Sequence, residues 1–433
     1  MENKPRYNTS DIKVLTGLDA IRKRPGMYMG GTKNCSNLIL LVLDDFKRAF
    51  KEENGNLFSK ISILIHKNNV VKISINKCWL STKIVEGKSK LESLLTTINQ
   101  YGFELATVNA LSSKVHITIA ANGTKWTQKY QNGKPQPLKN CGNVNYSGTT
   151  IRFLPDKKYF SNLHFDQTQL STRLKELSYL HRGLSINFED RSIRKTHFHN
   201  PNGLEDLVLE LLPKSNNWKT KIPPVYLRDQ IPDFKLNAVI IFAEDFSCDM
   251  SFVNDEKTIE GGTHQKGLIA GVAQVLKIVS GCKKSVAIWK SVVQEGLISV
   301  LSINISDPHW AGSTKDELIS KEAYIKTKSL VVKNLLQLMH DNKKLQYEFK
   351  KLFINKYLMM DYTKHHDKYG LPTPQYVKNK LAELFINPKE YDYLIEQYIE
   401  FERLHEECLK QQKLDSKMLK ENPPQSPFAK GEE

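Results

Sequence analysis

The first half of the chain alternates between two hydrophobic periods, one typical of helices and one typical of strands. Residues 38–53 repeat apolar side chains such as Leu43 and Phe46 at near-helical spacing, which predicts a helix with a charged outer face. Residues 60–76 instead alternate over two short runs that flank a polar turn at 67–69. This second pattern predicts a β-hairpin.

The same two patterns continue along the first half. They predict helices over 91–113 and 166–183 and strands over 114–137 and 148–155. Asn122-Gly123 and Asn132-Gly133 are residue pairs typical of tight hairpin turns, and Gly183 is placed to close the second helix. The fold class is therefore expected to be α+β with a largely antiparallel sheet.

A polar stretch that contains prolines, at 214–233, separates this half from the rest, and we place a domain boundary near 218–224. A second α+β unit is predicted to follow, with a strand over 235–245, a helix over 264–280, a strand over 296–305 and a helix from about 315. Beyond about 340 the chain is rich in lysine with partial helical periodicity. Its final stretch has the composition of a disordered tail.

The composition narrows the class of protein. The length of 433 residues allows two or three domains. The net charge of +16 indicates either a solvated basic surface or a polyanionic partner, with nucleic acid first. Six cysteines without a C-x-x-C pair indicate neither a zinc site nor a disulfide framework, so a cytoplasmic setting is expected. The apolar runs are too short to cross a bilayer, and no membrane partner is expected.

Several ordered motifs resemble the B subunits of type IIA DNA topoisomerases, gyrase and topoisomerase IV. The longest is RYNTSDIKVLTGLDAIRKRPGMYMGG, from Arg6 to Gly31. The others follow in the family's order: TVNALS, GTTIRFLP, RLKELSYLHRGLSI, SFVN with GGTH, EGLISVLSINISDP and STKDELIS. The resemblance covers roughly residues 6–330. It indicates a degenerate paralogue of these subunits that is limited to their ATPase and transducer region.

The resemblance implies a GHKL-type ATPase α/β sandwich, then a transducer domain of ribosomal-S5-like fold and a helical C-terminal extension. The expected limits are an arm over 1–30, the ATPase-like domain over 31–218, the transducer over 219–330, a basic helical extension over 331–420 and a disordered tail over 421–433. The family's arm wraps onto the partner protomer, which implies a dimer-contact role for Tyr7 and Ile12. The family's TOPRIM motifs for DNA cleavage are not found after residue 330.

The catalytic helix of the family carries a glutamate, the general base, and four residues later an asparagine that ligates Mg²⁺. Leu41 and Asp45 stand at these positions, so no general base is intact. Asp45 could still hold Mg²⁺ as a carboxylate ligand. The alternative, which we favour, is an aspartate on the helix surface. Arg48 and Ala49 replace two further acidic residues of the family.

The adenine-reading motif of the family, Asp-x-Gly-x-Gly, is also altered. Lys77 or Cys78 replaces the aspartate, and Trp79 falls on a glycine. Lysine only donates hydrogen bonds, so it cannot accept one from the adenine amino group. The chain after Trp79 is also too short for the family's ATP lid, which we therefore expect to be deleted.

The remaining nucleotide-linked positions are remnants. In NQYGFEL, aligned with the phosphate loop, only Gly102 of three glycines survives, and Glu104 replaces the last one. Thr149 is retained as in the family. Lys315 matches the transducer lysine that reaches the terminal phosphate, although Ser313 replaces the glutamine before it. An exposed lysine near a helix start is an equally good interpretation of Lys315.

Three functions follow from these patterns. We expect first a pseudo-ATPase, without ATP or Mg²⁺ as cofactors, that binds DNA or a topoisomerase partner as a homodimer or as a heterodimer with a type IIA subunit. The second is the ATP-binding half of a split type II topoisomerase. The third is a basic DNA-binding structural protein. All three are consistent with a cytoplasmic, nucleoid-associated location.

Overall fold

The computed structural model describes residues 17–51, 60–85, 87–98, 102–191, 194–212, 222–243, 246–369 and 374–385, together with residues 395, 396, 403 and 410. The chain divides into two compact units, Met1–Leu207 and Val208–Glu433, each with its own sheet and hydrophobic core. The arm residues Tyr7 and Ile12, most of the expected boundary and the tail 421–433 lie outside the described residues. The expected domain limits therefore stay predictions.

The first unit is built on a sheet that has nine strands within the described residues, in the order β11-β10-β1-β2-β9-β5-β6-β7, with β8 also paired to β6. Its strands are β1 (Lys60–Ile65), β2 (Val71–Ile75), β5 (Ser112–Ala121), β6 (Thr124–Gln131), β7 (Lys134–Pro135), β8 (Lys139–Asn143), β9 (Gly148–Pro155), β10 (Ser185–Asp190) and β11 (Arg194–His199). Every neighbouring pair is antiparallel except β1 with β10. The predicted hairpin and the largely antiparallel sheet are thus confirmed.

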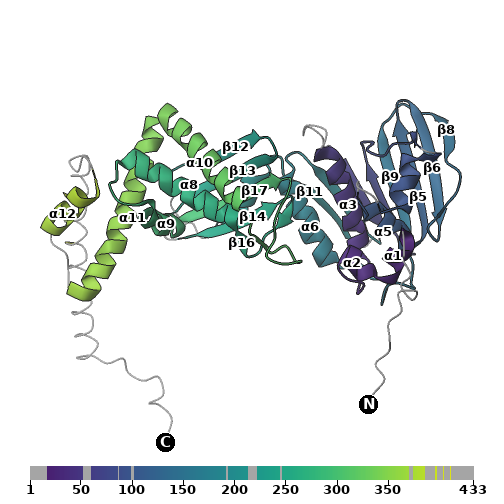
Figure 1. Ribbon diagram of the computed structural model, residues 1–433, viewed down its shortest axis with the longest axis horizontal. Coiled ribbons are helices and arrows are strands. Elements are labelled where there is room, and N and C mark those ends of the chain that lie inside the picture. Colours follow the sequence, from purple (N-terminus) through teal and green to yellow (C-terminus); the bar gives the residue numbers. More distant parts are fainter. Residues whose placement is uncertain are drawn as a thin grey trace, which may run out of the picture. The chain divides into compact units, whose positions relative to one another are not determined.

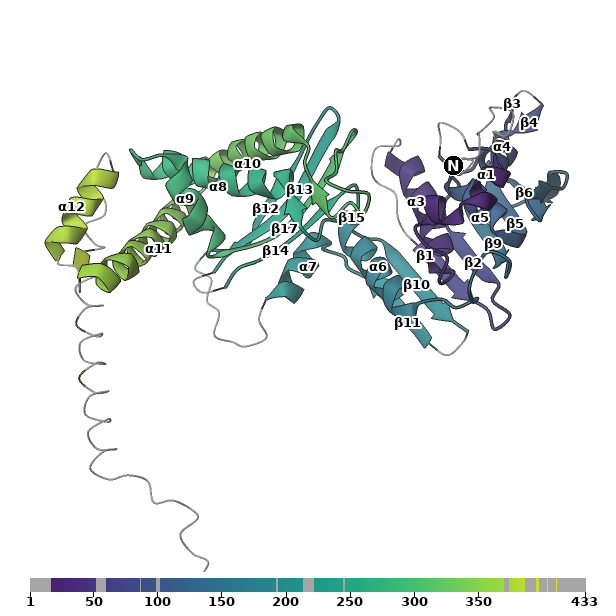
Figure 2. The same ribbon diagram turned by 60° about the horizontal axis from the view of Figure 1, so that its bottom comes forward.

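Helices cover one face of this sheet. They are α1 (Leu18–Lys23), α2 (Pro25–Met29), α3 (Ser36–Lys51), α4 (Lys90–Thr96), α5 (Glu104–Ala110) and α6 (Gln167–Leu180). Figure 1 and Figure 2 show α3, α5 and α6 lying along the sheet. The apolar side of α3, including Leu38 and Phe46, is buried against alternate residues of the strands such as Ile63 and Ile73. This arrangement is the expected sandwich of one helical layer on one sheet.

The single helix predicted over 91–113 is wrong. The structure has two shorter helices there, α4 and α5, preceded by a small hairpin of β3 (Ile84–Val85) and β4 (Lys88–Ser89). Ser89 starts α4 by accepting a hydrogen bond from the Glu92 N–H, and α4 ends at Thr96 because the next residue, Thr97, has an extended backbone. Gly102 has a φ of 123°, which a helix cannot contain. Hydrophobic spacing continued across this break and hid it.

The second unit has a five-stranded sheet in the order β12-β13-β17-β14-β15. Its elements are α7 (Leu204–Leu211), which spans the division between the units, β12 (Val225–Ile231), β13 (Phe234–Phe242), β14 (Cys248–Val253), β15 (Glu256–Lys257), β16 (Gly261–Gly262), α8 (Thr263–Ser280), α9 (Val286–Gln294), β17 (Leu297–Ile305), β18 (Glu317–Leu318), α10 (Lys321–Asp341), α11 (Lys343–Tyr369) and α12 (Pro374–Leu384). Strands β14 and β17 are parallel and are joined by a crossover that contains α8 and α9.

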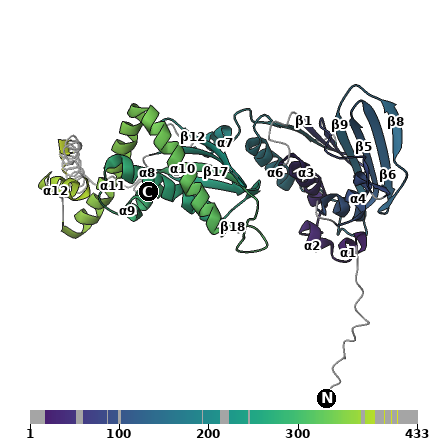
Figure 3. The same ribbon diagram turned by 45° about the horizontal axis from the view of Figure 1, so that its top comes forward.

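Helix α10 packs closely on α8 (Figure 3). Two glycines of α8 allow this approach: a Cβ atom would lie 2.7 Å from the Tyr324 carbonyl oxygen at Gly267, and 2.7 Å from Val331 Cγ1 at Gly271. The helix predicted from about 315 begins later, at Lys321. Lys315 instead has a φ of 62° and precedes β18, which pairs with β16. Within the described ranges, no helix is long and apolar enough to span a bilayer.

Candidate functional site

Helix α3 carries the two positions at which the sequence comparison expected a general base and a metal ligand. Leu41 and Asp45 lie about one turn apart on this helix. Leu41 is 8% exposed and belongs to the hydrophobic core of the first unit. Its side chain has no polar atom, so it cannot take a proton from water.

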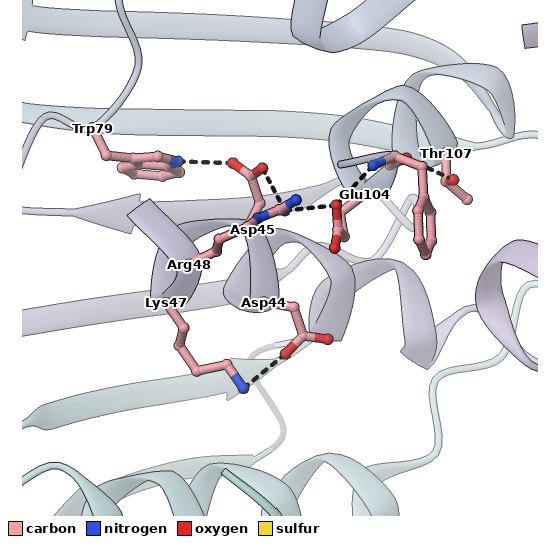
Figure 4. A network of polar contacts seen from close by, with 8 residues as sticks. Asp44, Asp45, Lys47, Arg48, Trp79, Glu104 and Thr107 are labelled. Atoms are coloured by element: carbon pink, nitrogen blue, oxygen red, sulfur yellow. Dashed lines mark hydrogen bonds and ion pairs between the residues drawn. The ribbon is translucent and has the colours of Figure 1, made fainter. Parts of the chain in front are cut away.

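Asp45 is buried and hydrogen-bonded, so the interpretation of a surface aspartate is wrong. It is 7% exposed. Trp79 donates from Nε1 to Asp45 Oδ2 at 2.9 Å, and Arg48 donates from Nη2 to Asp45 Oδ1 at 3.0 Å (Figure 4). Trp79 also packs edge-on against Phe46, with ring centroids 5.0 Å apart. Both carboxylate oxygens of Asp45 are therefore bound to protein groups.

Arg48 continues the network from α3 to the start of α5. Its Nη2 lies 2.6 Å from Glu104 Oε2. The same Glu104 oxygen accepts a hydrogen bond from the Phe103 N–H at 2.9 Å. A Cβ atom added to Gly102 would clash with Arg48 Nη1, so the guanidinium lies directly over the Gly102 backbone. We call Asp45, Arg48, Trp79 and Glu104 the α3–α5 network.

The electrostatics of this network depend on burial. Burial raises the pKa of Asp45 to about 6, while the hydrogen bond from Trp79 and the charge of Arg48 act in the opposite direction. The carboxylates of Glu104 and Asp44 raise this pKa further. Above that pH the network holds two carboxylates, Asp45 and Glu104, around one guanidinium. The Glu104 carboxylate is therefore paired with a cation of the protein itself, which it shares with Asp45.

Three observations bear on whether this region could hold the ATP and Mg²⁺ of the resembled family. Mg²⁺ is commonly held by carboxylate oxygens, and each Asp45 oxygen here accepts a hydrogen bond, one from Trp79 and one from Arg48. A phosphate loop offers backbone N–H groups to the phosphates, whereas the Phe103 N–H is taken by the Glu104 carboxylate. In the part of the chain that the structure describes, no group of three or more metal-ligating side chains is present.

The other predicted positions are not part of the network. Thr149 lies on β9 between Ile75 and Ile119 of the neighbouring strands, and it is 2% exposed with no hydrogen-bond partner for its Oγ1. Lys315 belongs to the second unit. Sequence reasoning noted Arg48 and Glu104 separately but missed their pairing. The signal was available, because Arg48 replaces an acidic residue of the family and Glu104 replaces a glycine.

Three kinds of comparison relate the chain to known proteins. Residues 203–364 match the family model described as DNA gyrase B. Among curated proteins, the DNA gyrase B protein of Archaeoglobus fulgidus is 30% identical over 78% of this chain and 56% of the relative. The DNA gyrase B protein of Metamycoplasma hominis is 29% identical over 83% of this chain and 60% of the relative. The chain thus spans little more than half the length of these relatives.

Solved structures show the same fold. The 43K ATPase domain of Thermus thermophilus gyrase B, in complex with an aminocoumarin, matches with a TM-score of 0.70 and 21% identity over 81% of this chain and 97% of that one. The topoisomerase IV ATP-binding domain of Francisella tularensis, in complex with a small-molecule inhibitor, matches with a TM-score of 0.65 and 25% identity over 80% of this chain and 98% of that one. The chain therefore matches the DNA gyrase B family model over residues 203–364 and is similar to DNA gyrase B proteins over most of its own length.

Proposed function

We propose that this chain is a pseudo-ATPase of the gyrase B type, which keeps the ATPase and transducer fold but neither binds nor hydrolyses ATP. One observation carries the proposal: the Arg48–Glu104 ion pair lies over the Gly102 backbone, where the family places its phosphate loop. Glu104 supplies an internal anion that accepts the Phe103 N–H. The protein thereby satisfies, with its own side chains, groups that would otherwise bind a phosphate.

Each part of a nucleotide would meet a separate obstacle. A triphosphate would have to displace Glu104 from both Arg48 and the Phe103 N–H, and it would meet repulsion from the freed carboxylate. An attacking water would find Leu41 in place of a base, and the loss of a general base alone costs about 10²–10⁴-fold in rate. Trp79, bound to Asp45, would occupy space where the family has a glycine.

The remaining activity is expected to be binding. The net charge of +16 supports sequence-independent contacts to nucleic acid phosphates. The curated relatives are gyrase subunits, which supports a second copy of this chain or another type IIA topoisomerase protein as partner. Without an ATP-ordered lid, such pairing is set by concentration and not by nucleotide.

The test is a phosphate-release assay on the full chain with Mg²⁺ and DNA, beside the double variant Leu41→Glu, Asp45→Asn. The variant restores the family's residues at both α3 positions, and the Thermus thermophilus ATPase domain serves as the active control. We expect no turnover above background from either form, because Glu104 and Trp79 remain. Hydrolysis by the unmodified chain at rates near those of the control would contradict the proposal and favour the ATP-binding half of a split topoisomerase.

A further inference from the structure

A pair of histidines lies on the edge strand of the first unit, apart from the α3–α5 network. His197 and His199 are two residues apart on β11, so their side chains emerge on the same face of the sheet. β11 is the last strand of its sheet, and both side chains are exposed. Their ring centroids are 6.0 Å apart with an interplanar angle of 34°. Phe198, between them, points to the opposite face and packs on the core.

Both imidazoles are oriented through the same ring nitrogen. His199 Nδ1 lies 3.3 Å from the carbonyl oxygen of Leu184, which can only accept a hydrogen bond. His197 Nδ1 lies 2.8 Å from Asn187 Oδ1, on the neighbouring strand. A proton on each Nδ1 leaves each Nε2 with a free lone pair. Histidines that bind metals are usually held in this way, with one ring N–H donated to a carbonyl or amide oxygen.

We propose that His197 and His199 form a binding site for a borderline divalent transition-metal ion such as Zn²⁺, Ni²⁺ or Cu²⁺, ligated by both Nε2 atoms. Imidazole is a preferred ligand of this class of ion. In a tetrahedral zinc site with Zn–N distances of about 2.0–2.1 Å, two ring centroids lie about 5 Å apart. The observed 6.0 Å requires the two exposed rings to approach by only about 1 Å.

The charges on this face leave room for a cation. The facing pairs in register are Lys195 with Glu189, His197 with Asn187 and His199 with Ser185. Lys195 Nζ lies 3.3 Å from Glu189 Oε2, so the lysine two residues before His197 is paired with a carboxylate. Water, or the Glu189 carboxylate after release from Lys195, completes the coordination sphere. Two protein nitrogens with open positions define an exchangeable surface site and not a closed structural one.

The experiment uses the full chain in a Cys141→Ser background, because that exposed thiol would also bind zinc. Zn²⁺ and Ni²⁺ are titrated by calorimetry in a non-coordinating buffer. His197→Asn and His199→Asn should each remove one equivalent of bound metal. Asn187→Ala should lower the affinity for that metal ion by about 10–100-fold, because Asn187 orients the His197 ring and does not itself bind the metal. His66→Asn, at another exposed histidine, is the matched control and should change nothing.

A second readout separates ligation from folding. Nitrogen-detected spectra of the histidine rings should show shifts at Nε2 of both residues on addition of Zn²⁺, with Nδ1 protonated before and after. Thermal midpoints of all variants without metal should match the parent, because both side chains are exposed. Unchanged stoichiometry and affinity in either histidine variant would overturn the proposal. The proposal would also be overturned if the bound metal were lost in only one of the two histidine variants.

Discussion

Replacement of Arg48 by methionine removes the cation that pairs α3 with Glu104 of α5 while keeping most of the side-chain volume. Two carboxylates then lose their counter-charge: Asp45, whose side chain is 9% exposed, and Glu104, whose side chain is 16% exposed. The Phe103 N–H and Trp79 Nε1 still donate to them, so neither is left without a hydrogen bond. The loss of stability in Arg48→Met should therefore be mainly electrostatic.

Removing one partner of a fully buried ion pair costs about 3–5 kcal/mol. Arg48 itself is 33% exposed, so water already screens part of its interaction with the carboxylates. We expect Arg48→Met to lower the free energy of unfolding by about 2–3 kcal/mol near neutral pH. The loss should shrink as the pH falls from about 8 to about 5, because Asp45, whose folded pKa is raised to about 6 by burial, then becomes protonated and no longer needs a counter-charge.

The assay is urea unfolding followed by circular dichroism and by tryptophan emission. Lys195→Met is the matched control, since Lys195 is 74% exposed in its pair with Glu189 and should cost no more than about 0.5 kcal/mol. The double variant Arg48→Met, Glu104→Gln should recover about 1 kcal/mol of the loss by removing one unpaired charge. A stability of Arg48→Met within about 0.5 kcal/mol of the parent at every pH would refute the reasoning.

Three further outcomes can be measured. Asp45→Asn should flatten the pH dependence of the free energy of unfolding, measured in urea. The folded pKa of Asp45 is about 6, above its ordinary 3.8, so its contribution to stability is full below about pH 4 and is lost as the pH rises to about 6. The change across this range should be about 3 kcal/mol in the parent and absent from the variant. DNA affinity, followed by fluorescence anisotropy, should fall by about 10³-fold or more between about 50 and 200 mM salt if about six or more phosphates are contacted, and salt-insensitive binding would contradict this. Sedimentation with and without ATP and Mg²⁺ should give the same distribution of monomers and dimers, whereas dimers seen only with ATP would exclude constitutive pairing.

Much of the fold followed from short-range pattern. The hairpin of β1 and β2 and the strand β9 were predictable because alternate residues such as Ile61, Ile63 and Ile73 are buried on one face of the sheet. The break between α4 and α5 was not, because hydrophobic spacing measures burial and not backbone continuity. Its one sequence signal was Gly102, whose positive φ ends any helix.

Only the chemistry of single side chains in the candidate site could be predicted from the sequence. Leu41 in place of a base could be read from the chain, since chemistry that a side chain lacks needs no structure to establish. The burial of Asp45 could not, because its partner Trp79 is 34 residues away and a polar helix face gives no sign of which charge turns inward. The Arg48–Glu104 pair likewise depends on the packing of α3 against α5.

The central claim of the proposed function is that protein side chains occupy the place where the resembled family binds the phosphates of ATP. Its most direct test is calorimetric titration of a non-hydrolysable ATP analogue with Mg²⁺ into the full chain, with the Thermus thermophilus gyrase B ATPase domain as positive control. We predict no saturable heat up to about 1 mM analogue, a concentration that detects free energies of binding near about −4 kcal/mol. Saturable binding with a Kd below about 100 μM, lost in Gly102→Trp, would contradict the claim.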